Sequence, residues 1–406
     1  MSLDGRPKGR PSFYPMTFAR PTMLSVFPLV ALLSMAVPAA LSFPQQSFDE
    51  IAQRADSART ADRVTEAIAL YRQAVQLRPS WSDGWLWLGD LLYDQNRFSE
   101  AQDSFTHLVA ITPQPGPAWA MKALCEYEMR DYAHSLDDLE TWMHGGLQGS
   151  EGLADVATFH RALLLTREGR FDRALHLLTE RAQRRGESPL LVEAMGLASL
   201  RMPNLPGDYP PGLREEVWLA GKATFYLSVQ ELERGQDYSH RLLAEYGQQP
   251  QVHYIHGLLL EAQSKSDEAL QDFHTELQIF PQNSEAMLEI AGIDIDNGKL
   301  DEATILARRA VQIDPANPEA HHVLGRVLLA AGQTKESAQE LQSAARLAPD
   351  NAAIHLHLAT AYQRLGRKED AQQEMTTYFA IRKKKWPDRS ESMKTRNTSH
   401  SPEAPQ

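Results

Sequence analysis

The chain has 406 residues, of which 42% are hydrophobic and 23% are charged, a composition typical of a folded protein too long for one ordinary compact core. Its formal net charge is −12, but residues 1–42 carry +3 and residues 382–406 carry +4, which leaves −19 for the residues between them. Because binding to nucleic acid needs a basic surface, this acidic body argues against a nucleic-acid-binding protein.

Residues 1–42 are typical of a secretory signal peptide. A basic stretch that ends at Arg20 is followed by the apolar run MLSVFPLVALLSMAVPAALSF, in which small residues near Ala40 suit cleavage. We therefore expect an exported protein, periplasmic or extracellular, and no Cys follows the run directly to carry a lipid. The run is nearly long enough to stay in a membrane as an N-terminal anchor, which is the alternative.

Residues 43–200 are predicted to form helical hairpins. The stretch WSDGWLWLGDLLYDQNRFSEAQDSFTHLVAITP, which begins at Trp81, has two runs of apolar and small residues at helical spacing. Weaker pairs of runs follow around Trp119 and around Ala162. The only cysteine, Cys125, falls in the middle of one predicted helix, so no disulfide can form within the chain and we expect a buried, inert thiol.

The segment RMPNLPGDYPPGL, residues 201–213, is rich in proline and glycine and cannot continue a helix. We expect a long loop that interrupts the hairpins. It would be either an irregular joint between two halves of the chain or a loop that contacts a partner. A long helix from about Arg214 to Arg234 is predicted to follow it.

Residues 214–385 contain a sequence repeat of 34 residues. The stretches QIFPQNSEA, QIDPANPEA and RLAPDNAAI place prolines at Pro281, Pro315 and Pro349, each 34 residues after the one before. A fixed period of this length predicts stacked copies of one small structural unit. Each copy contains two amphipathic runs, so each unit is predicted to be a pair of helices.

The residues between the runs predict where each helix begins and ends. Gly298 tolerates a positive φ and would end a first helix, while Asp301 favours the N-terminal turn of the second helix. Pro315 would stop that second helix. Asn317 would then cap the first helix of the next unit, and Pro318 would begin it.

Small residues also recur where the two helices of a unit are expected to cross, because a larger side chain there would push the helix axes apart. They are Gly257, Ala291, Gly325 and Ala359 in the first helix and Ala269, Ala303, Ser337 and Ala371 in the second. This pattern resembles the tetratricopeptide repeat (TPR) family, over about residues 46–385. The most specific copy carries Trp85, Leu88, Gly89, Ala101, Phe105 and Pro113.

The resemblance implies an all-α fold: an α-solenoid of about nine TPR helix-turn-helix units in a right-handed superhelix, interrupted by one Pro-rich loop. Residues 43–200 and 214–385 would hold the N-terminal and C-terminal units. Residues 386–406 are polar and lack periodicity, so we expect a disordered tail. The arrangement resembles exported bacterial members of the family whose role is unassigned.

In this family the first helix of each unit lines a concave groove. Transferred to this sequence, the resemblance assigns to the groove Asp83, Leu86, Asp90, Tyr93, Asp94, Ala120, Leu124, Tyr127 and Glu128 near one end and His322, Arg326, Gln363 and Arg364 near the other. A groove acidic at one end and more basic at the other would fix the direction of an extended peptide. The alternative is a solvated surface that binds nothing. The cluster of Lys, Asn and Arg with which some members clamp a terminal carboxylate is not present.

The histidines do not suggest a metal site. His253, His321 and His355 occupy equivalent positions in separate units, whose helices should lie about 8–10 Å apart. Zinc–nitrogen bonds are about 2 Å long, so these side chains are not expected to share an ion. No phosphate-binding loop or hydrolase motif is present in the sequence. We therefore expect no enzyme activity, no cofactor and no metal.

The sequence thus predicts an exported scaffold or adaptor of the cell envelope that binds a protein or peptide partner of unknown identity in its groove. The alternative is an accessory subunit that handles an envelope polysaccharide or another polymer. We expect no nucleic-acid partner, and contact with a membrane only through the N-terminal segment if it stays uncleaved.

Overall fold

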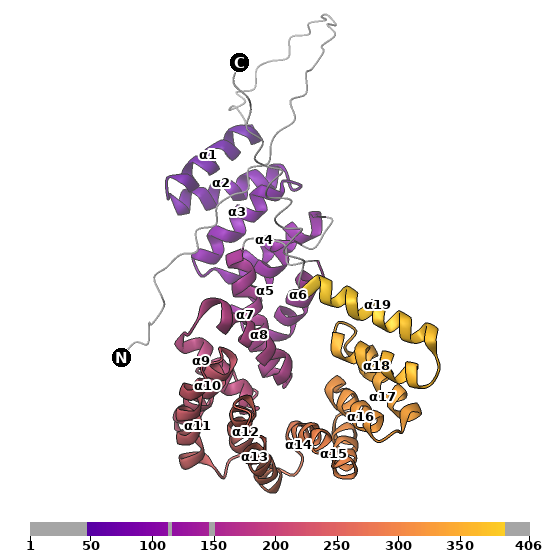
Figure 1. Ribbon diagram of the computed structural model, residues 1–406. Helices are drawn as coiled ribbons and strands as arrows, with labels where there is room; N and C mark the ends of the chain where they lie inside the picture. Colours follow the sequence, from indigo (N-terminus) through magenta and orange to yellow (C-terminus); the bar gives the residue numbers. More distant parts are fainter. Residues whose placement is uncertain (1–46, 113–115, 146–150, 386–406) are drawn as a thin grey trace, which may run out of the picture. The chain divides into compact units, whose positions relative to one another are not determined.

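The computed structural model describes residues 47–112, 116–145 and 151–385, so the predicted signal peptide and tail lie outside the described residues. The described residues form nineteen α-helices and one short 3-10 helix, with no strand among them (Figure 1). The chain divides into two compact units, Met1–Arg181 and Ala182–Gln406. The all-α repeat fold is as predicted, whereas the handedness of its superhelix stays a prediction.

The helices of unit 1, the last of which runs four residues past its boundary, form hairpins between consecutive partners. The first three hairpins are α1 with α2, α3 with α4 and α5 with α6. Arg181 Nη1 on α8 lies 2.7 Å from Asp155 Oδ2 on α7 and joins the fourth. The bounds are α1 (Phe48–Thr60), α2 (Val64–Leu77), α3 (Ser82–Asp94), α4 (Phe98–Ile111), α5 (Pro117–Glu128), α6 (Tyr132–His144), α7 (Glu151–Arg167) and α8 (Phe171–Arg185).

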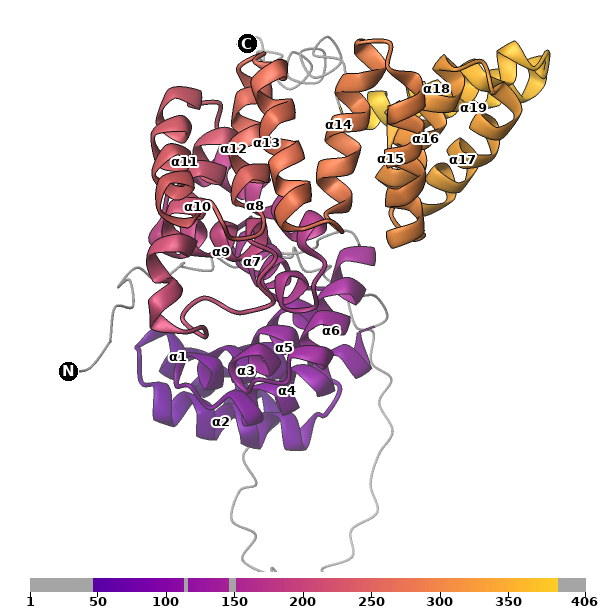
Figure 2. The ribbon, with the colours of Figure 1, turned by 90° about the horizontal axis from the view of Figure 1, so that it is seen from below.

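Unit 2 contains five further hairpins, shown from a second side in Figure 2. They pair α10 with α11, α12 with α13, α14 with α15, α16 with α17 and α18 with α19. The bounds are α9 (Pro189–Ser199), η1 (Pro211–Leu213), α10 (Arg214–Ser228), α11 (Leu232–Tyr246), α12 (Val252–Ala262), α13 (Ser266–Ile279), α14 (Ser284–Asp296), α15 (Leu300–Ile313), α16 (Pro318–Ala330), α17 (Thr334–Leu347), α18 (Ala352–Arg364) and α19 (Lys368–Lys385).

One left-handed residue turns the chain inside most hairpins. These residues follow one another at intervals of 34 within each unit and have φ between 56° and 77°: Asp62, Asn96, Arg130, Gln230, Ser264, Gly298, Gly332 and Gly366. The turn predicted at Gly298 is therefore confirmed. The long helix predicted from Arg214 to Arg234 is wrong, because α10 ends at Ser228 and the chain turns at Gln230. The residue at the turn is a glutamine, so the sequence contains no glycine there that would predict the end of the helix.

The joint between units also follows the predicted chemistry. The second helix α15 ends at Ile313, two residues before Pro315. The side chain of Asn317 then accepts hydrogen bonds from the backbone N–H groups of Glu319 and Ala320, with Pro318 in the first turn of α16. Asparagine caps stand at the same position in the neighbouring units, at Asn283 and Asn351.

The glycines predicted at the helix crossings face a large side chain of the second helix. A Cβ atom on Gly89 would lie 2.7 Å from the ring of Phe105, and one on Gly257 would lie 2.6 Å from the ring of Phe273. Gly325 meets Leu341 in the same way at 2.5 Å. In these three hairpins a small residue of the first helix thus packs against a large residue of the second.

Enlarging a small crossing residue should destabilise the array. We expect Gly89→Leu and Ala303→Leu each to cost about 1–3 kcal/mol by overpacking and to lower the thermal midpoint by several degrees. Ala303 is fully buried, whereas Ala330→Leu, at an exposed position of α16, should leave the midpoint nearly unchanged. Unchanged midpoints for both core variants would show that the repeat register is wrong.

The helix α9 has no second helix of its own and packs against α10 instead. A Cβ atom on Gly196 would lie 2.0 Å from the carbonyl oxygen of Val217, and one on Gly221 would lie 2.0 Å from that of Val192. The backbones of α9 and α10 are therefore in direct contact. Sequence reasoning did not identify this pair of glycines.

Residues 201–213, the predicted loop, pack on unit 2 itself. Leu205 is buried, and the backbone N–H of Gly207 donates to Glu193 Oε1 on α9 at 2.8 Å. Arg201 Nη2 lies 3.0 Å from Glu285 Oε1 on α14. These contacts make the segment part of the joint between α9 and α10, and a role in contacting a partner stays a prediction.

Candidate functional site

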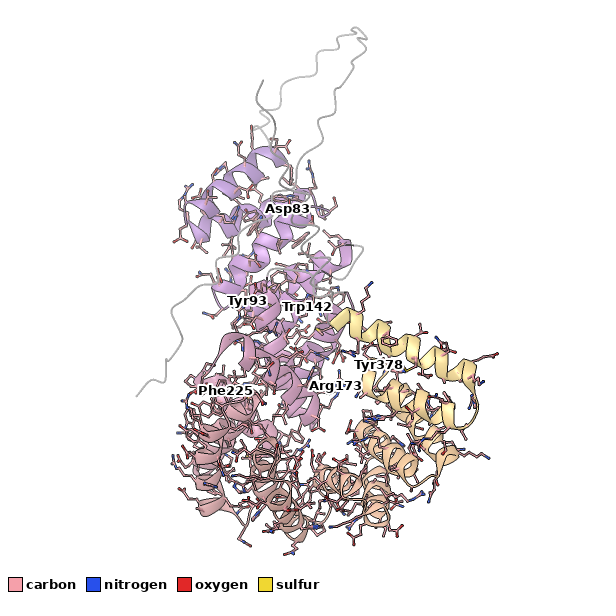
Figure 3. The ribbon with its side chains drawn as sticks, in the orientation of Figure 1. Asp83, Tyr93, Trp142, Arg173, Phe225 and Tyr378 are labelled. Carbon is pink, nitrogen blue, oxygen red and sulfur yellow. The ribbon has the colours of Figure 1, made fainter. Side chains whose placement is uncertain are left out.

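The first helix of the second hairpin, α3, presents three carboxylates on one side. Asp83, Asp90 and Asp94 are spaced by seven and four residues, which places them on the same helical face (Asp83 is labelled in Figure 3). Asp83 and Asp94 are exposed and Asp90 is half-buried. We call these three residues and Glu128 of α5 the acidic surface.

Asp90 has an unusual ionisation equilibrium. Burial, and then the negative charge of Asp94, raise its pKa from the ordinary value to about 7, although the charge of Arg59 opposes this shift. Ionising Asp90 therefore costs free energy that a nearby cation would recover. The charge of Arg59 offsets only part of this cost, because the Arg59 guanidinium also contacts other side chains.

Arg59 is engaged by the first hairpin and by α3. Its guanidinium carbon lies 3.9 Å from the centre of the Trp87 ring, and its Nε donates to the hydroxyl of Tyr71 at 3.0 Å. A terminal nitrogen lies 3.6 Å from Asp56 Oδ1. These three contacts direct the cation toward α1 and α2 as well as toward α3.

Two tyrosines pack beside the acidic surface. Burial and the charge of Glu128 raise the pKa of Tyr93, which places Glu128 beside α3. Tyr93 (labelled in Figure 3) packs against Phe98 with ring centres 5.4 Å apart. Tyr127 of α5 packs edge-on against His160 of α7 at 4.5 Å.

The other predicted groove residues of unit 1 divide between surface and core. Leu86 is half-buried and Glu128 is exposed. Leu124 is 3% exposed and Ala120 is fully buried, so both contribute to the interior. The structure thus brings Asp90, Asp94, Tyr93 and Glu128 together, as the acidic and aromatic part of the predicted groove.

The predicted groove residues of unit 2 form a separate set. Arg326 is half-buried, and Gln363 and Arg364 are exposed. Arg364 donates from Nη1 to the carbonyl oxygen of Leu329 at 2.7 Å, which ties α18 to α16. His322 is only 5% exposed. Because the acidic surface belongs to unit 1, a single groove with opposite charges at its two ends stays a prediction.

Two histidines of neighbouring units meet, which the sequence reasoning did not foresee. His322 Nε2 on α16 lies 2.9 Å from His357 Nδ1 on α18. The two residues are 35 positions apart, one more than the repeat, so they are not equivalent. The expectation for His253, His321 and His355 concerned equivalent positions, so it did not cover this pair.

The histidines at the equivalent positions act within their own units. His253, His321 and His355 each hydrogen-bond, at 2.6 Å through Nδ1, a carboxylate 19 residues later in the second helix: Asp272, Glu340 and Glu374. In the last two units Nε2 also lies 3.0 Å and 2.9 Å from a proline carbonyl oxygen of the preceding joint. These residues join the two helices of a hairpin, and the recurring spacing of 19 was the available signal in the sequence.

Unit 2 carries acidic groups that the prediction of a basic end omitted. Burial, and then the charges of Glu319 and Glu261, raise the pKa of Glu289 on α14 to about 7. Glu261 Oε2 is buried without a hydrogen-bond partner among the described residues. The predicted groove of unit 2 therefore carries acidic as well as basic side chains.

In the three described ranges, no group of three or more His, Cys, Asp or Glu side chains is arranged to hold a metal ion. None of the helices described there is long and apolar enough to span a membrane. The only cysteine, Cys125, is buried, and its pKa is raised by burial to about 12, as expected for an inert thiol.

Comparison with known sequences identifies the repeat. The family model described as "Tetratricopeptide repeat" matches residues 58–125, 260–327 and 328–385. Together with the 34-residue period and the helical hairpins, this match shows that the chain contains tetratricopeptide repeats. No curated protein sequence matches the chain.

Solved structures of the same type are similar at low sequence identity. MamA (residues 41 to end) from Desulfovibrio magneticus RS-1 is 18% identical, with a TM-score of 0.38, over 42% of this chain and 97% of that one. The APC/C hetero-tetramer Cut9–Hcn1 contains a chain that is 13% identical, with a TM-score of 0.38, over 82% of this chain and 87% of that one. YrrB, described as a TPR protein with an unusual peptide-binding site, is 18% identical, with a TM-score of 0.35, over 46% and 95%.

Proposed function

We propose that this protein is an exported scaffold or adaptor of the cell envelope, without catalytic activity, that holds a polypeptide partner against the acidic surface of unit 1. Proteins built from tetratricopeptide repeats generally bind protein or peptide partners. Export is proposed from the N-terminal sequence alone.

The observation that carries this proposal is the state of Asp90. Its half-buried carboxylate makes no hydrogen bond or ion pair with the described residues, and its pKa is raised to about 7 by burial and by Asp94. A lysine or arginine side chain placed there would neutralise Asp90, whose ionisation the neighbouring Asp94 disfavours. A basic segment of a partner therefore fits this surface better than an acidic or an uncharged one.

The aromatic residues favour a polypeptide over a polysaccharide. A sugar ring would need a free aromatic face, but Trp87 is covered by Arg59 and Tyr93 packs on Phe98. Tyr127 packs against His160. Strong retention of the protein on glycan columns, without capture of any polypeptide, would favour the polysaccharide alternative.

Cross-linking in intact cells tests the proposal. The intact protein should capture a recurrent envelope partner through a lysine- or arginine-rich segment, and mass spectrometry should place its own mature N-terminus near Ala40. The test variant is Asp90→Asn with Asp94→Asn, which removes both carboxylates at nearly constant shape and should lose that partner. Equal capture by the variant would move the site elsewhere, and the absence of a recurrent partner would contradict the scaffold role.

A further inference from the structure

The contact between His322 and His357 joins two consecutive units of the C-terminal array. His322 Nε2 and His357 Nδ1 are 2.9 Å apart, and the ring centres are 5.1 Å apart. His322 is buried and His357 is half-buried, so water screens the pair poorly. The pair lies where α18 packs on α16.

This distance leaves room for one proton between the facing nitrogens. One ring must donate and the other must accept, because two N–H groups would repel each other at 2.9 Å. On its other side His322 Nδ1 lies 3.3 Å from each oxygen of Glu319. His357 also has a hydrogen bond to the backbone of Ala353, on its own helix.

The charged groups around the pair disfavour a second proton. Burial, and then the charges of His322 and Arg326, lower the pKa of His357 from 6.5 to about 4, while the backbone of Ala353 and the charge of Glu319 act in the opposite direction. A histidine whose pKa is lowered by folding contributes its full stability above about pH 6.5. That contribution is lost as the pH falls from 6.5 toward 4, because the unfolded chain takes up the proton first.

The position of the pair decides which part of the chain would respond. The α18/α19 hairpin is the last in the described residues, and it packs on α16 and α17. In a repeat array each unit contacts only its neighbours, and within the described residues the neighbour of the α18/α19 hairpin is the α16/α17 hairpin. Weakening the joint between α16 and α18 therefore acts on the α18/α19 hairpin first.

We propose that the contact between α16 and α18 is a proton-sensitive joint, which holds while His357 is neutral and loosens in mild acid, so that the α18/α19 hairpin opens from the array. The joint is separate from the acidic surface of unit 1. Its test therefore does not depend on any partner.

Hydrogen exchange on the intact protein at pH 7 and pH 5, corrected for the intrinsic exchange rate, tests this proposal. Protection of α18 and α19 should fall by about tenfold more than protection of α12 and α13. His357→Asn keeps an amide group facing His322 but does not titrate, so the acid-specific loss should disappear. His176→Asn, which changes an exposed histidine on α8, should behave as wild type. Equal loss in wild type and His357→Asn would overturn the proposal.

A second measurement keeps the proposal testable if His357→Asn is poorly folded. In His322→Gln the neighbouring imidazole charge is gone, so the NMR titration midpoint of the His357 ring should move upward. An unchanged midpoint would show that the two rings are not coupled, and would contradict the proposal.

Discussion

Replacing Gly221 by leucine is expected to destabilise unit 2 strongly. A Cβ atom at this position would lie 2.0 Å from the carbonyl oxygen of Val192, which is backbone and has no rotamer to change. The helices α9 and α10 must therefore separate. We expect a loss of about 3 kcal/mol or more, at the upper end of overpacking costs, and a clear fall in the thermal midpoint.

The loss should be accompanied by a local change near the start of α9. Lys222 pairs with Glu187 at 2.7 Å, and its ammonium lies 5.3 Å from the centre of the Trp218 ring. Separation of α9 should thus alter tryptophan fluorescence before global unfolding. The matched control is Gly292→Ala, where the added Cβ meets nothing within 4 Å and should stabilise α14 by about 0.5–1 kcal/mol. A Gly221→Leu midpoint equal to that of wild type would contradict the close contact.

Reversing the charge of the acidic surface is expected to abolish binding of a basic partner. Asp90→Lys with Asp94→Lys places two cations where the proposal requires a negative surface, and the helical circular dichroism should stay unchanged. Wild-type binding should strengthen as the pH rises through about 7, because Asp90 is neutral below its pKa and attracts a cation only above it. The measurement is an affinity series from pH 6 to 8 at constant salt.

The control for charge reversal changes two exposed acidic residues outside the acidic surface. Asp103 on α4 and Asp137 on α6 are both exposed, so Asp103→Lys with Asp137→Lys alters the net charge of the chain equally. This variant should bind the partner with nearly wild-type affinity at moderate salt, because exposed distant charges are screened. Binding that survives at Asp90→Lys with Asp94→Lys would place the site elsewhere.

The fold was predictable because one local solution is repeated. Once the 34-residue period was read, Asn317 and Pro318 gave the start of a helix and Gly298 gave the end of one, and the same chemistry recurs in neighbouring units. The acidic character of α3 was also readable, since Asp83, Asp90 and Asp94 share one face. The sequence could not give the burial that raises the pKa of Asp90 to about 7.

Features that break the repeat were not predictable from it. Gln230 turns the chain with φ 62° where no glycine or proline marks the end of α10. Gly196 and Gly221 form a contact that the repeat does not contain, because α9 packs on α10 without a second helix of its own. The His322–His357 contact depends on an offset of 35 residues between units, so comparing equivalent positions could not reveal it.

Selection of random peptides displayed against the intact protein tests the central claim most directly, because it requires no knowledge of the natural partner. We expect peptides rich in lysine and arginine to be enriched on the wild-type protein. Asp90→Asn with Asp94→Asn should remove this enrichment, whereas Asp103→Asn with Asp137→Asn should retain it. Enrichment of peptides without positive charge, or of the same peptides on both variants, would contradict binding at the acidic surface.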